Sequence, residues 1–166
     1  MEVLDAIKNR RSIRRYQDKD VPDDKVMQVL EAGRWAPSAH NSQPRKFIVV
    51  RDEKTRKELA RVATYGSFLA EAPVAIAVVI DPSSSNHPVE DGAAATQNML
   101  LTAYALGLGS CWIGVYGSAY EDRAKRILGI PEDKRLQSLI ALGYAAGSGS
   151  TSRIELSKLV CYERYQ

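Results

Sequence analysis

The sequence predicts a single α+β or three-layer α/β domain, on two observations. The chain has 166 residues, of which 45% are hydrophobic and 26% are charged, values that are typical of one ordinary globular domain and disfavour a disordered or disulfide-framework protein. Segments with helical periodicity alternate with apolar runs of strand type, which favours helices packed on a sheet. We therefore expect several helices and about four or five strands within one domain that spans residues 1–166.

The first third of the chain predicts two helices and a strand. Val3, Leu4 and Ile7 have helical spacing and predict a short opening helix. A second helix begins at Asp23 and Asp24, whose charges suit an N-terminal turn, and it ends before Pro37. Its expected inward stripe consists of Val26, Met27, Val29, Leu30 and Gly33. A loop rich in turn formers, 38–44, then leads into an apolar strand at 47–50.

The alternation continues to residue 144. The Ala-rich segment 90–106 is almost uncharged, which predicts a central helix buried nearly all round. The other expected elements are a helix at 53–62, a strand at 73–80, an exposed connection at 81–88, a strand at 110–115, a helix at 119–128, a strand at 136–144, a flexible run at 147–152 and a terminal arm at 153–166.

Charge, cysteines and apolar runs restrict the class of protein. The net charge is only +3, but five basic residues, Lys8, Arg10, Arg11, Arg14 and Arg15, fall within eight positions. Cys111 and Cys161 lack C-x-x-C spacing, so neither a redox dithiol nor a zinc ribbon is indicated. We see no signal segment and no apolar run near the ~18 residues that span a bilayer. We therefore expect a cytoplasmic protein with no membrane partner.

Most common catalytic motifs are absent from the sequence. It has no G-x-S-x-G, H-E-x-x-H or G-x-x-x-x-G-K-[ST] pattern. Gly107-Leu-Gly109 joins a predicted helix to a predicted strand, the reverse of the order in a dinucleotide-binding turn. His40 and His87 lie in different loops and are best interpreted as exposed side chains, so we expect no metal site.

The segment Arg10-Arg-Ser-Ile-Arg-Arg15 is the strongest candidate site. Arginine forks bind phosphate oxygens in pairs and serine adds a neutral donor, so the segment could hold a phosphorylated ligand without a metal. A solvated basic patch is the simpler interpretation, with Arg11 and Arg15 facing water. A small nucleic-acid-binding module is a further alternative, although clustered aromatic residues are absent. Loop 38–44 could likewise be an ordinary turn with no ligand.

Six motifs in order resemble the flavin-dependent nitroreductase family over nearly the whole chain. They are Arg10-Arg-Ser-Ile-Arg14, Ala36-Pro-Ser-Ala-His-Asn-Ser-Gln-Pro44, Ala72-Pro-Val, Gly107-Leu-Gly-Ser-Cys-Trp-Ile-Gly114, Ala141-Leu-Gly-Tyr144 and a late Arg153. The resemblance implies an α+β nitroreductase-like fold, with a central mixed, mostly antiparallel sheet flanked by helices. It also implies a homodimer with two FMN molecules at the interface, and a C-terminal arm from about residue 150 that extends toward the partner.

The resemblance also implies roles for single residues. Arg10 and Ser12 would face the ribityl phosphate, and Arg14 the phosphate or the pyrimidine edge, where a positive charge stabilises reduced flavin. Ile113 and Gly114 match the segment whose backbone N–H points at flavin N5. The full expected FMN site comprises Arg10, Arg11, Ser12, Arg14, Pro37, Ser38, Asn41, Gln43, Ile113, Gly114 and Arg153, of which Pro37 to Gln43 would act across the dimer. Cys111 and Trp112 are interpreted as core residues.

The chain departs from the family pattern at two points. The late basic pair is Ser152-Arg153, so one phosphate charge is missing unless Arg11 or Arg15 compensates. Only residues 115–120 connect the strand at 110–115 to the next helix, which predicts an open substrate pocket with little selectivity.

The resemblance implies an FMN oxidoreductase with a ping-pong cycle. NADH or NADPH would reduce the flavin at N5, and the reduced flavin would then reduce nitroaromatics, quinones or similar flat acceptors. No catalytic side chain is required, and Tyr65 and Tyr116 are the nearest candidate proton donors. The alternative within the same fold is a specialised flavin enzyme, such as a reductive dehalogenase or a flavin-consuming enzyme.

Overall fold

One four-stranded sheet organises the chain. The computed structural model describes residues 2–165, and Met1 and Gln166 lie outside this range. The strands are β1 (Arg45–Val50), β2 (Val74–Ile80), β3 (Gly109–Gly114) and β4 (Arg135–Gly143). Their spatial order is β1-β2-β4-β3, and each neighbouring pair is antiparallel. The sheet therefore has β1 and β3 at its two edges.

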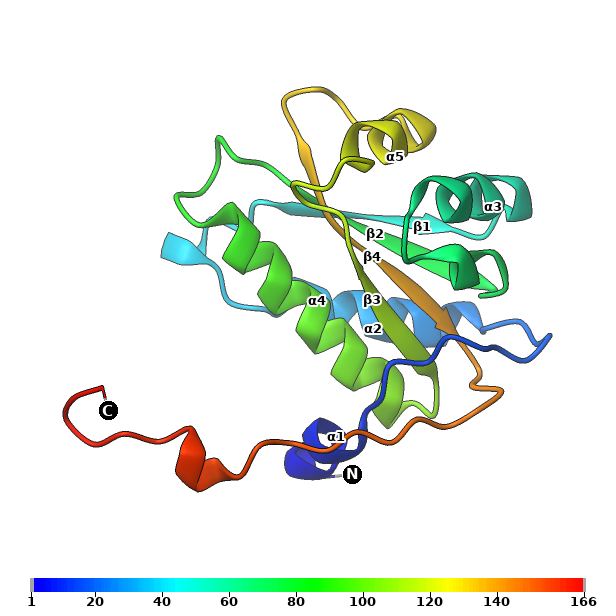
Figure 1. Ribbon diagram of the computed structural model, residues 1–166. Helices are drawn as coiled ribbons and strands as arrows, with labels where there is room; N and C mark the ends of the chain where they lie inside the picture. The colour runs from blue at the N-terminus through cyan, green and yellow to red at the C-terminus, as the bar shows by residue number, and fades with distance from the viewer. Residues whose placement is uncertain (1, 166) are drawn as a thin grey trace.

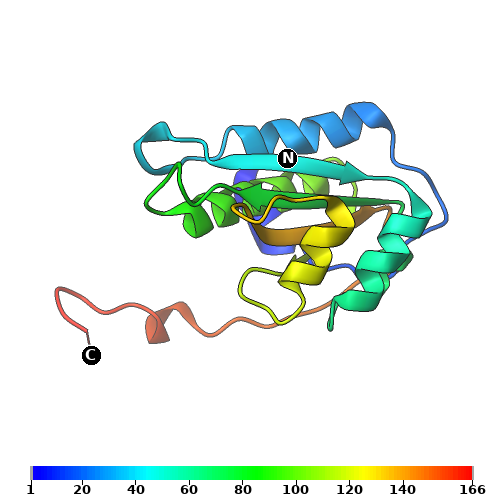
Figure 2. The ribbon, with the colours of Figure 1, turned by 90° about the horizontal axis from the view of Figure 1, so that it is seen from above.

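Helices cover both faces of the sheet (Figures 1 and 2). The α-helices are α1 (Val3–Asn9), α2 (Asp23–Arg34), α3 (Glu53–Val62), α4 (Pro88–Ala105) and α5 (Glu121–Leu128). Short 3-10 turns occur at η1 (Ala39–Asn41), η2 (Ser67–Ala70) and η3 (Leu156–Lys158). Helices α2 and α4 lie on one face, α3 and α5 on the other, and α1 lies at the end of the sheet. The expected α+β class is confirmed.

The alternation of strand side chains divides the core in two. In β2, Ala75, Ala77 and Val79 pack toward α3 and α5, whereas the intervening residues pack toward α2 and α4. This two-sided burial explains why β2 is an uninterrupted apolar run. β4 carries an irregularity, because Val78 pairs with Ser138 and Val79 with Leu136. Such a bulge bends the strand locally.

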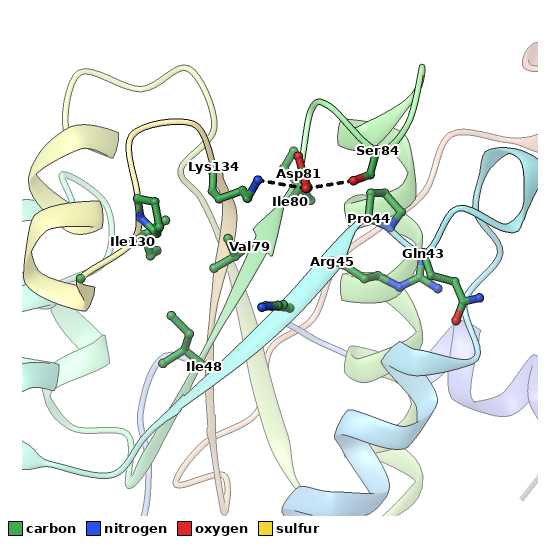
Figure 3. Close-up of a pocket in the computed structure, with 13 residues that line it drawn as sticks. Gln43, Pro44, Arg45, Ile48, Val79, Ile80, Asp81, Ser84, Ile130 and Lys134 are labelled. Atoms are coloured by element: carbon green, nitrogen blue, oxygen red, sulfur yellow. Dashed lines mark hydrogen bonds and ion pairs between the residues drawn. The ribbon is translucent and has the colours of Figure 1, made fainter.

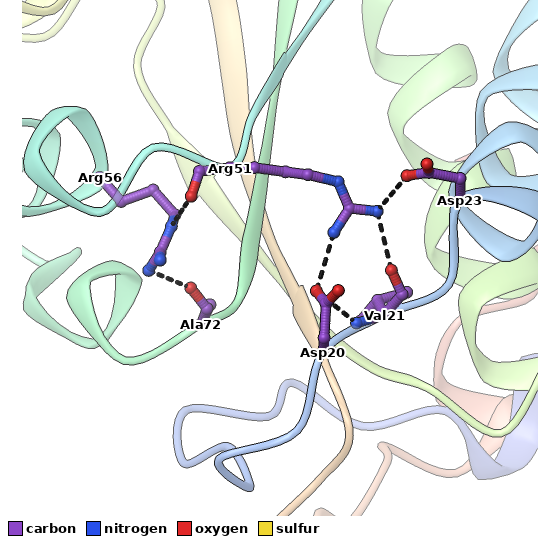
Figure 4. Close-up of polar contacts among 6 residues, drawn as sticks. All are labelled: Asp20, Val21, Asp23, Arg51, Arg56 and Ala72. Atoms are coloured by element: carbon purple, nitrogen blue, oxygen red, sulfur yellow. Dashed lines mark hydrogen bonds and ion pairs between the residues drawn. The ribbon is translucent and has the colours of Figure 1, made fainter.

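The N-terminal segment supplies the only parallel pairing among the described residues. Ser12 forms a parallel bridge with Ser110 of β3, and Tyr16 forms an antiparallel bridge with Ala145. The segment is also tied down near α2, because Arg51 contacts Asp20 at 2.9 Å, Asp23 at 2.7 Å and the Val21 carbonyl at 2.7 Å (Figure 4). These contacts hold residues 10–23 along one end of the sheet.

Two sequence-based expectations for the helices were wrong. Met27 was expected on the inward stripe of α2 but is 63% exposed, because Val26, Val29 and Gly33 already fill the contact with the sheet side. The helix α4 was expected to be buried nearly all round, but Gln97 and Ala105 are exposed. Ala93, Ala94 and Leu101 of α4 are also only partly covered by the rest of the chain. The predicted helix at 119–128 begins two residues later, at Glu121.

Apolar side chains gather on the outside at both ends of the chain. Val3, Leu4 and Ile7 of α1 are exposed, as are Ile154, Leu156, Leu159 and Val160 of the C-terminal arm. The arm, residues 153–165, leaves the body of the protein past α1 (Figure 1). Within residues 2–165, no helix is long and apolar enough to cross a membrane.

Candidate functional site

The basic segment runs in extended form beside β3. The Ile13 N–H donates to the Ser110 carbonyl at 3.0 Å, next to the bridge between Ser12 and Ser110. Alternate residues of an extended chain share one face. Arg10, Ser12 and Arg14 therefore project together, and the intervening Ile13 packs against Gly109.

The three side chains lie near the buried thiol of Cys111, with the Arg14 guanidinium over the Phe68 ring, 5.8 Å from the ring centroid. Burial raises the pKa of the Cys111 thiol, whereas the charge of Arg14, a hydrogen bond with Ser12 and the charge of Arg10 lower it. All three expected residues are thus within interaction range of one buried sulfur. The 2% exposure of Cys111 confirms that it is a core residue.

Arg153 joins this cluster from the other end of the chain. Burial lowers the pKa of Arg10, and the neighbouring charges of Arg11 and Arg153 lower it further. The Arg153 guanidinium is exposed and donates to Thr151 Oγ1 at 2.8 Å and to the Ser152 carbonyl at 3.0 Å. Three like charges within interaction range repel one another, so an anion placed among them would be stabilised.

A pocket of about 330 Å³ opens at this cluster. It is lined by Asn9, Arg10, Arg11, Ile13, Tyr104, Gly107, Leu108, Gly109, Ser110, Ala145, Gly147, Ser148 and Gly149. In residues 2–165, Ser110 Oγ and Arg11 Nε are among the few buried side-chain atoms without a hydrogen-bond partner. A buried unpaired donor costs free energy, which a bound oxygen-rich anion would recover.

The structure gives Arg11 a local partner that the sequence did not predict. Its Nη1 donates to the Lys8 carbonyl at 2.7 Å and to the Arg10 carbonyl at 2.9 Å. These bonds satisfy carbonyls at the C-terminal end of α1. Arg15 is exposed and reaches the Ala146 carbonyl at 3.4 Å.

Sequence reasoning missed the loop of residues 147–149. Its small residues were interpreted as a flexible run, yet Gly147, Ser148 and Gly149 line both the pocket at Arg10 and the adjoining hollow at Ser12 and Arg14. Alternating glycine and serine is typical both of linkers and of loops that approach a ligand closely. Only their position beside the basic segment, which the bridge at Tyr16 and Ala145 fixes, distinguishes the two.

Gly114 ends β3 with open space above its backbone. A Cβ built at Gly114 would meet no atom within 4 Å. In a strand, the N–H and C=O of one residue point to the same side, and successive residues alternate. Because the Ser110 carbonyl faces the N-terminal segment, Gly114 also faces this outer side, whereas Ile113 faces β4. Of the two expected residues, only Gly114 thus presents its N–H at the sheet edge.

The loop of residues 37–43 is built at the other end of α4. Arg45 donates to the Pro37 carbonyl at 3.2 Å and also to the carbonyls of Arg34 and Ala36. The Ala39 N–H donates to Asp91, in the first turn of α4, at 3.0 Å. These bonds fix where the loop starts and where it crosses α4.

The tip of this loop is exposed and polar. His40, Asn41 and Gln43 all have positive φ angles, between 51° and 54°, and the Gln43 N–H donates to Ser38 Oγ at 2.9 Å. Gln43 and Pro44 border a pocket between β1 and the turn after α5 (Figure 3). In that pocket Lys134 and Asp81 form an ion pair at 3.0 Å. The side chains of Asn41 and Gln43 are open to solvent.

The structure therefore does not bring all the expected site residues together within one chain. Asp91, near the start of α4, contacts the loop, whereas Gly107 and Gly109, just after its end, border the basic pocket. With 18 residues, α4 is about 27 Å long. Ser38, Asn41 and Gln43 therefore lie near one end of α4, and Arg10, Ser12 and Arg14 lie near the other.

Other chemistry finds little support in the described residues. Between Glu2 and Tyr165 there is no group of three His, Cys, Asp or Glu side chains that could hold a metal ion. Tyr65 is 86% exposed in the turn after α3. The guanidinium of Arg135 lies over the ring of Tyr116, 4.3 Å from the ring centroid.

The fold and this pocket define an α+β protein with an arginine-lined pocket at one sheet edge. The model of the nitroreductase family matches residues 7–64 and 60–144. The chain belongs to the nitroreductase family.

Similar proteins span almost the whole chain. A Methanothermobacter thermautotrophicus protein, named as an NADH dehydrogenase/NAD(P)H nitroreductase, is 43% identical, over 95% of this chain and 88% of that protein. A nitroreductase structure from Desulfovibrio desulfuricans, in complex with FMN, is 38% identical with a TM-score of 0.88, over 100% of this chain and 99% of that one. An FMN-dependent nitroreductase from Clostridium difficile R20291 is 31% identical with a TM-score of 0.90, over 98% and 99%.

Proposed function

We propose that the protein is an FMN-dependent oxidoreductase that takes electrons from NADH or NADPH. The placement of Arg10, Ser12 and Arg14 on the extended segment beside β3, next to the unpaired hydroxyl of Ser110, carries the proposal. Arginines together with a serine suit a phosphate monoester such as that of FMN. The FMN complex of the similar Desulfovibrio protein supports the same cofactor.

Different basic and polar residues would bind different parts of FMN. Arg10 and Ser12, with Arg153, would bind the phosphate, and Arg14 the phosphate or the pyrimidine edge. A cation at that edge favours the negative charge that reduction adds. The open space over Gly114 leaves room for a flat ring close to the backbone. FMN, when bound, accepts a hydride at N5 and passes electrons to a second substrate.

A second copy of the chain completes the proposed site. Residues Pro37, Ser38, Asn41 and Gln43 lie one helix length from the basic pocket, so they can serve only the pocket of another copy. The exposed apolar residues of α1 and of the arm, together with the half-covered α4, offer a surface for that copy. We therefore propose a homodimer, with the arm of each protomer lying on its partner.

The proposed acceptors are flat aromatic molecules such as nitroaromatics and quinones. The connection from β3 to α5 spans only residues 115–120, so little of the chain covers the sheet edge near Gly114. Tyr65 and Tyr116 are exposed aromatic side chains in this part of the molecule and could stack on a flat acceptor. A pocket with few fixed polar groups discriminates weakly among such molecules.

Cofactor analysis tests the proposal. The purified protein should be yellow, release FMN on denaturation and lose its visible absorbance when NAD(P)H is added without oxygen. A quinone added afterwards should restore the colour, which distinguishes a general reductase from a specialised flavin enzyme. A colourless protein that takes up no added FMN would contradict the proposal.

A further inference from the structure

A tyrosine outside the expected site contacts the backbone at the proposed reaction centre. The hydroxyl of Tyr120 donates a hydrogen bond to the carbonyl of Gly114. Tyr120 is only 6% exposed and packs with the α3 and α5 side of the core. Burial raises the pKa of its hydroxyl, so the group stays protonated and remains a donor.

The Gly114 carbonyl and N–H face the same outer side of β3, as derived above. Glycine has no Cβ to restrict its dihedral angles, and Gly114 is the last residue of the strand. The N–H groups of Val115 and Tyr116 donate to the Gln137 carbonyl at 3.4 and 3.2 Å and hold the chain after Gly114, but they do not restrain Gly114 on its outer side. The Tyr120 hydroxyl supplies that restraint by fixing the carbonyl.

The residue next to Tyr120 is held by several hydrogen bonds. Glu121, beside Tyr120, is 4% exposed and accepts from Arg135 Nε and Nη2, each at 2.7 Å. It also accepts from the Gly117 N–H at 2.8 Å and the Leu136 N–H at 3.2 Å. The start of α5 is thereby anchored to β4, and the Tyr120 ring has a fixed base from which its hydroxyl reaches Gly114.

We propose that Tyr120 is a positioning residue that holds the Gly114 backbone so that its N–H points at flavin N5. The inference rests on the proposed function, because it needs FMN at this edge. Tyr120 would touch neither the cofactor nor the substrate and would act only through Gly114. A donor misplaced by a fraction of an ångström to 1 Å can slow a reaction markedly.

The variant Tyr120→Phe tests the inference, since it removes the hydroxyl and keeps the buried ring. The rate of flavin bleaching by NADH in anaerobic stopped-flow measurements should fall about tenfold. FMN affinity should stay within twofold of wild type, because the phosphate residues are untouched. Tyr144→Phe is the matched control: its hydroxyl has no hydrogen bond to any residue in the range 2–165, and the variant should bleach at the wild-type rate.

Nuclear magnetic resonance of the FMN-free protein gives a second readout. In Tyr120→Phe, the backbone order parameter of the Gly114 amide should fall from a rigid value of about 0.85 toward about 0.6, while Leu139 and Ile140 in β4 keep the rigid value. In the wild type, added FMN should shift the Gly114 amide proton more than that of Ile113.

Three results would overturn the inference: a bleaching rate within twofold of wild type, an unchanged order parameter at Gly114, or a larger FMN shift at Ile113. Order parameters that fall throughout α5 and β4 would also overturn it, since the hydroxyl would then be structural only. Failure of wild-type protein to bind FMN would instead refute the proposed function. The two failures are therefore distinguishable.

Discussion

The two ends of α4 carry polar groups of opposite character. At its C-terminal end, Arg10 borders a pocket, Ser12 and Arg14 line the adjoining hollow, and the hydroxyl of Ser110 is buried without a hydrogen-bond partner. At its N-terminal end, the loop of residues 37–43 is anchored by Arg45 but carries Asn41 and Gln43 into solvent. The C-terminal end of α4 thus has a pocket with unpaired polar groups, whereas the loop at the N-terminal end has exposed polar groups and does not border that pocket in the same chain.

The difference shows what one copy of the chain can and cannot supply. The basic pocket is formed within a single chain, because the N-terminal segment, β3 and residues 147–153 meet there. In the proposed homodimer, the polar loop joins this pocket from a second copy, whose α4 runs in the opposite direction. The exposed apolar residues of α1 and the arm are consistent with such a pairing.

Removing the C-terminal arm should have the largest effect on FMN binding, because without the dimer neither end of α4 would face a second copy of the chain. Truncation after Arg153 deletes Ile154, Leu156 and Leu159, and burial of each such side chain contributes about 1.5–3 kcal/mol. We expect a monomer in sedimentation analysis and an FMN affinity lowered more than about 100-fold, equivalent to about 3 kcal/mol. Truncation after Tyr162 keeps these residues and should leave a dimer. A monomeric wild type, or a dimeric Arg153 truncation, would contradict the role of the arm.

Glu121→Gln should lower stability by about 2–3 kcal/mol without acting at either end of α4, because Glu121 loses charged hydrogen bonds to Arg135. Burial raises the pKa of Glu121, but Arg135 and the N–H groups of Gly117 and Leu136 outweigh it, so the pKa lies below its ordinary value. A lowered pKa adds stability above the unfolded value, and this stability is lost as pH falls through the folded value.

Urea unfolding at several pH values measures both effects. Wild-type stability should decline below about pH 4.5, the ordinary glutamate value, and Glu121→Gln should lack this part of the decline. Glu132→Gln, at an exposed position, is the control and should match wild type. Equal stability of the Glu121 variant and wild type at pH 7 would refute the buried ion pair.

Arginine substitutions at the C-terminal end of α4 should weaken FMN binding. Arg14→Ala or Arg153→Ala should each cost about 1.5–3 kcal/mol of FMN binding, as for a hydrogen bond to a charged group. That loss raises the dissociation constant about 10- to 150-fold, which fluorescence titration of FMN resolves. Arg123→Ala, an exposed arginine on α5, is the control. Unchanged affinity in both site variants would remove the phosphate roles.

Substitution in the loop should have the smallest effect. Gln43→Ala removes a neutral side chain and should raise the FMN dissociation constant about 2- to 10-fold, or about 0.5–1.5 kcal/mol. The unfolding midpoint should not change, because the Gln43 side chain is exposed. Gln28→Ala on α2 serves as the control in the same titration. A loss of FMN affinity as large as that of Arg153→Ala would contradict the smaller contribution expected for the loop at the N-terminal end of α4.

The elements that the sequence predicted best are those that local pattern determines. β2 is apolar on both faces, and Glu53–Val62 forms α3 behind Asp52, whose carboxylate caps the Thr55 N–H at 2.8 Å. The bulge near Ser138 could not be predicted, since it belongs to the pairing of two strands. Met27 was placed inward because periodicity indicates a face but not how wide the neighbouring surface is.

For the site, motif order predicted the residues but not their geometry. Arg10, Ser12 and Arg14 were predicted from the basic cluster and the family motif, whereas the extended conformation that places alternate residues on one face is seen only in the structure. The direction of the Gly114 N–H, and the contact of Tyr120 with Gly114, depend on which edge of β3 remains open. That edge is set by the strand order, which the sequence does not contain as a local signal.

A mixed dimer tests the central claim, that one FMN site uses two copies of the chain. Protein carrying Arg153→Ala is mixed with protein carrying Gln43→Ala, the differently tagged mixed dimer is isolated, and FMN is titrated. If the loop acts across the dimer, one of its two sites has neither substitution and the other has both. Half of the sites should then bind FMN with wild-type affinity, and half should bind it more weakly than either parent does. Two site classes that match the two parents, with none at wild-type affinity, would contradict it.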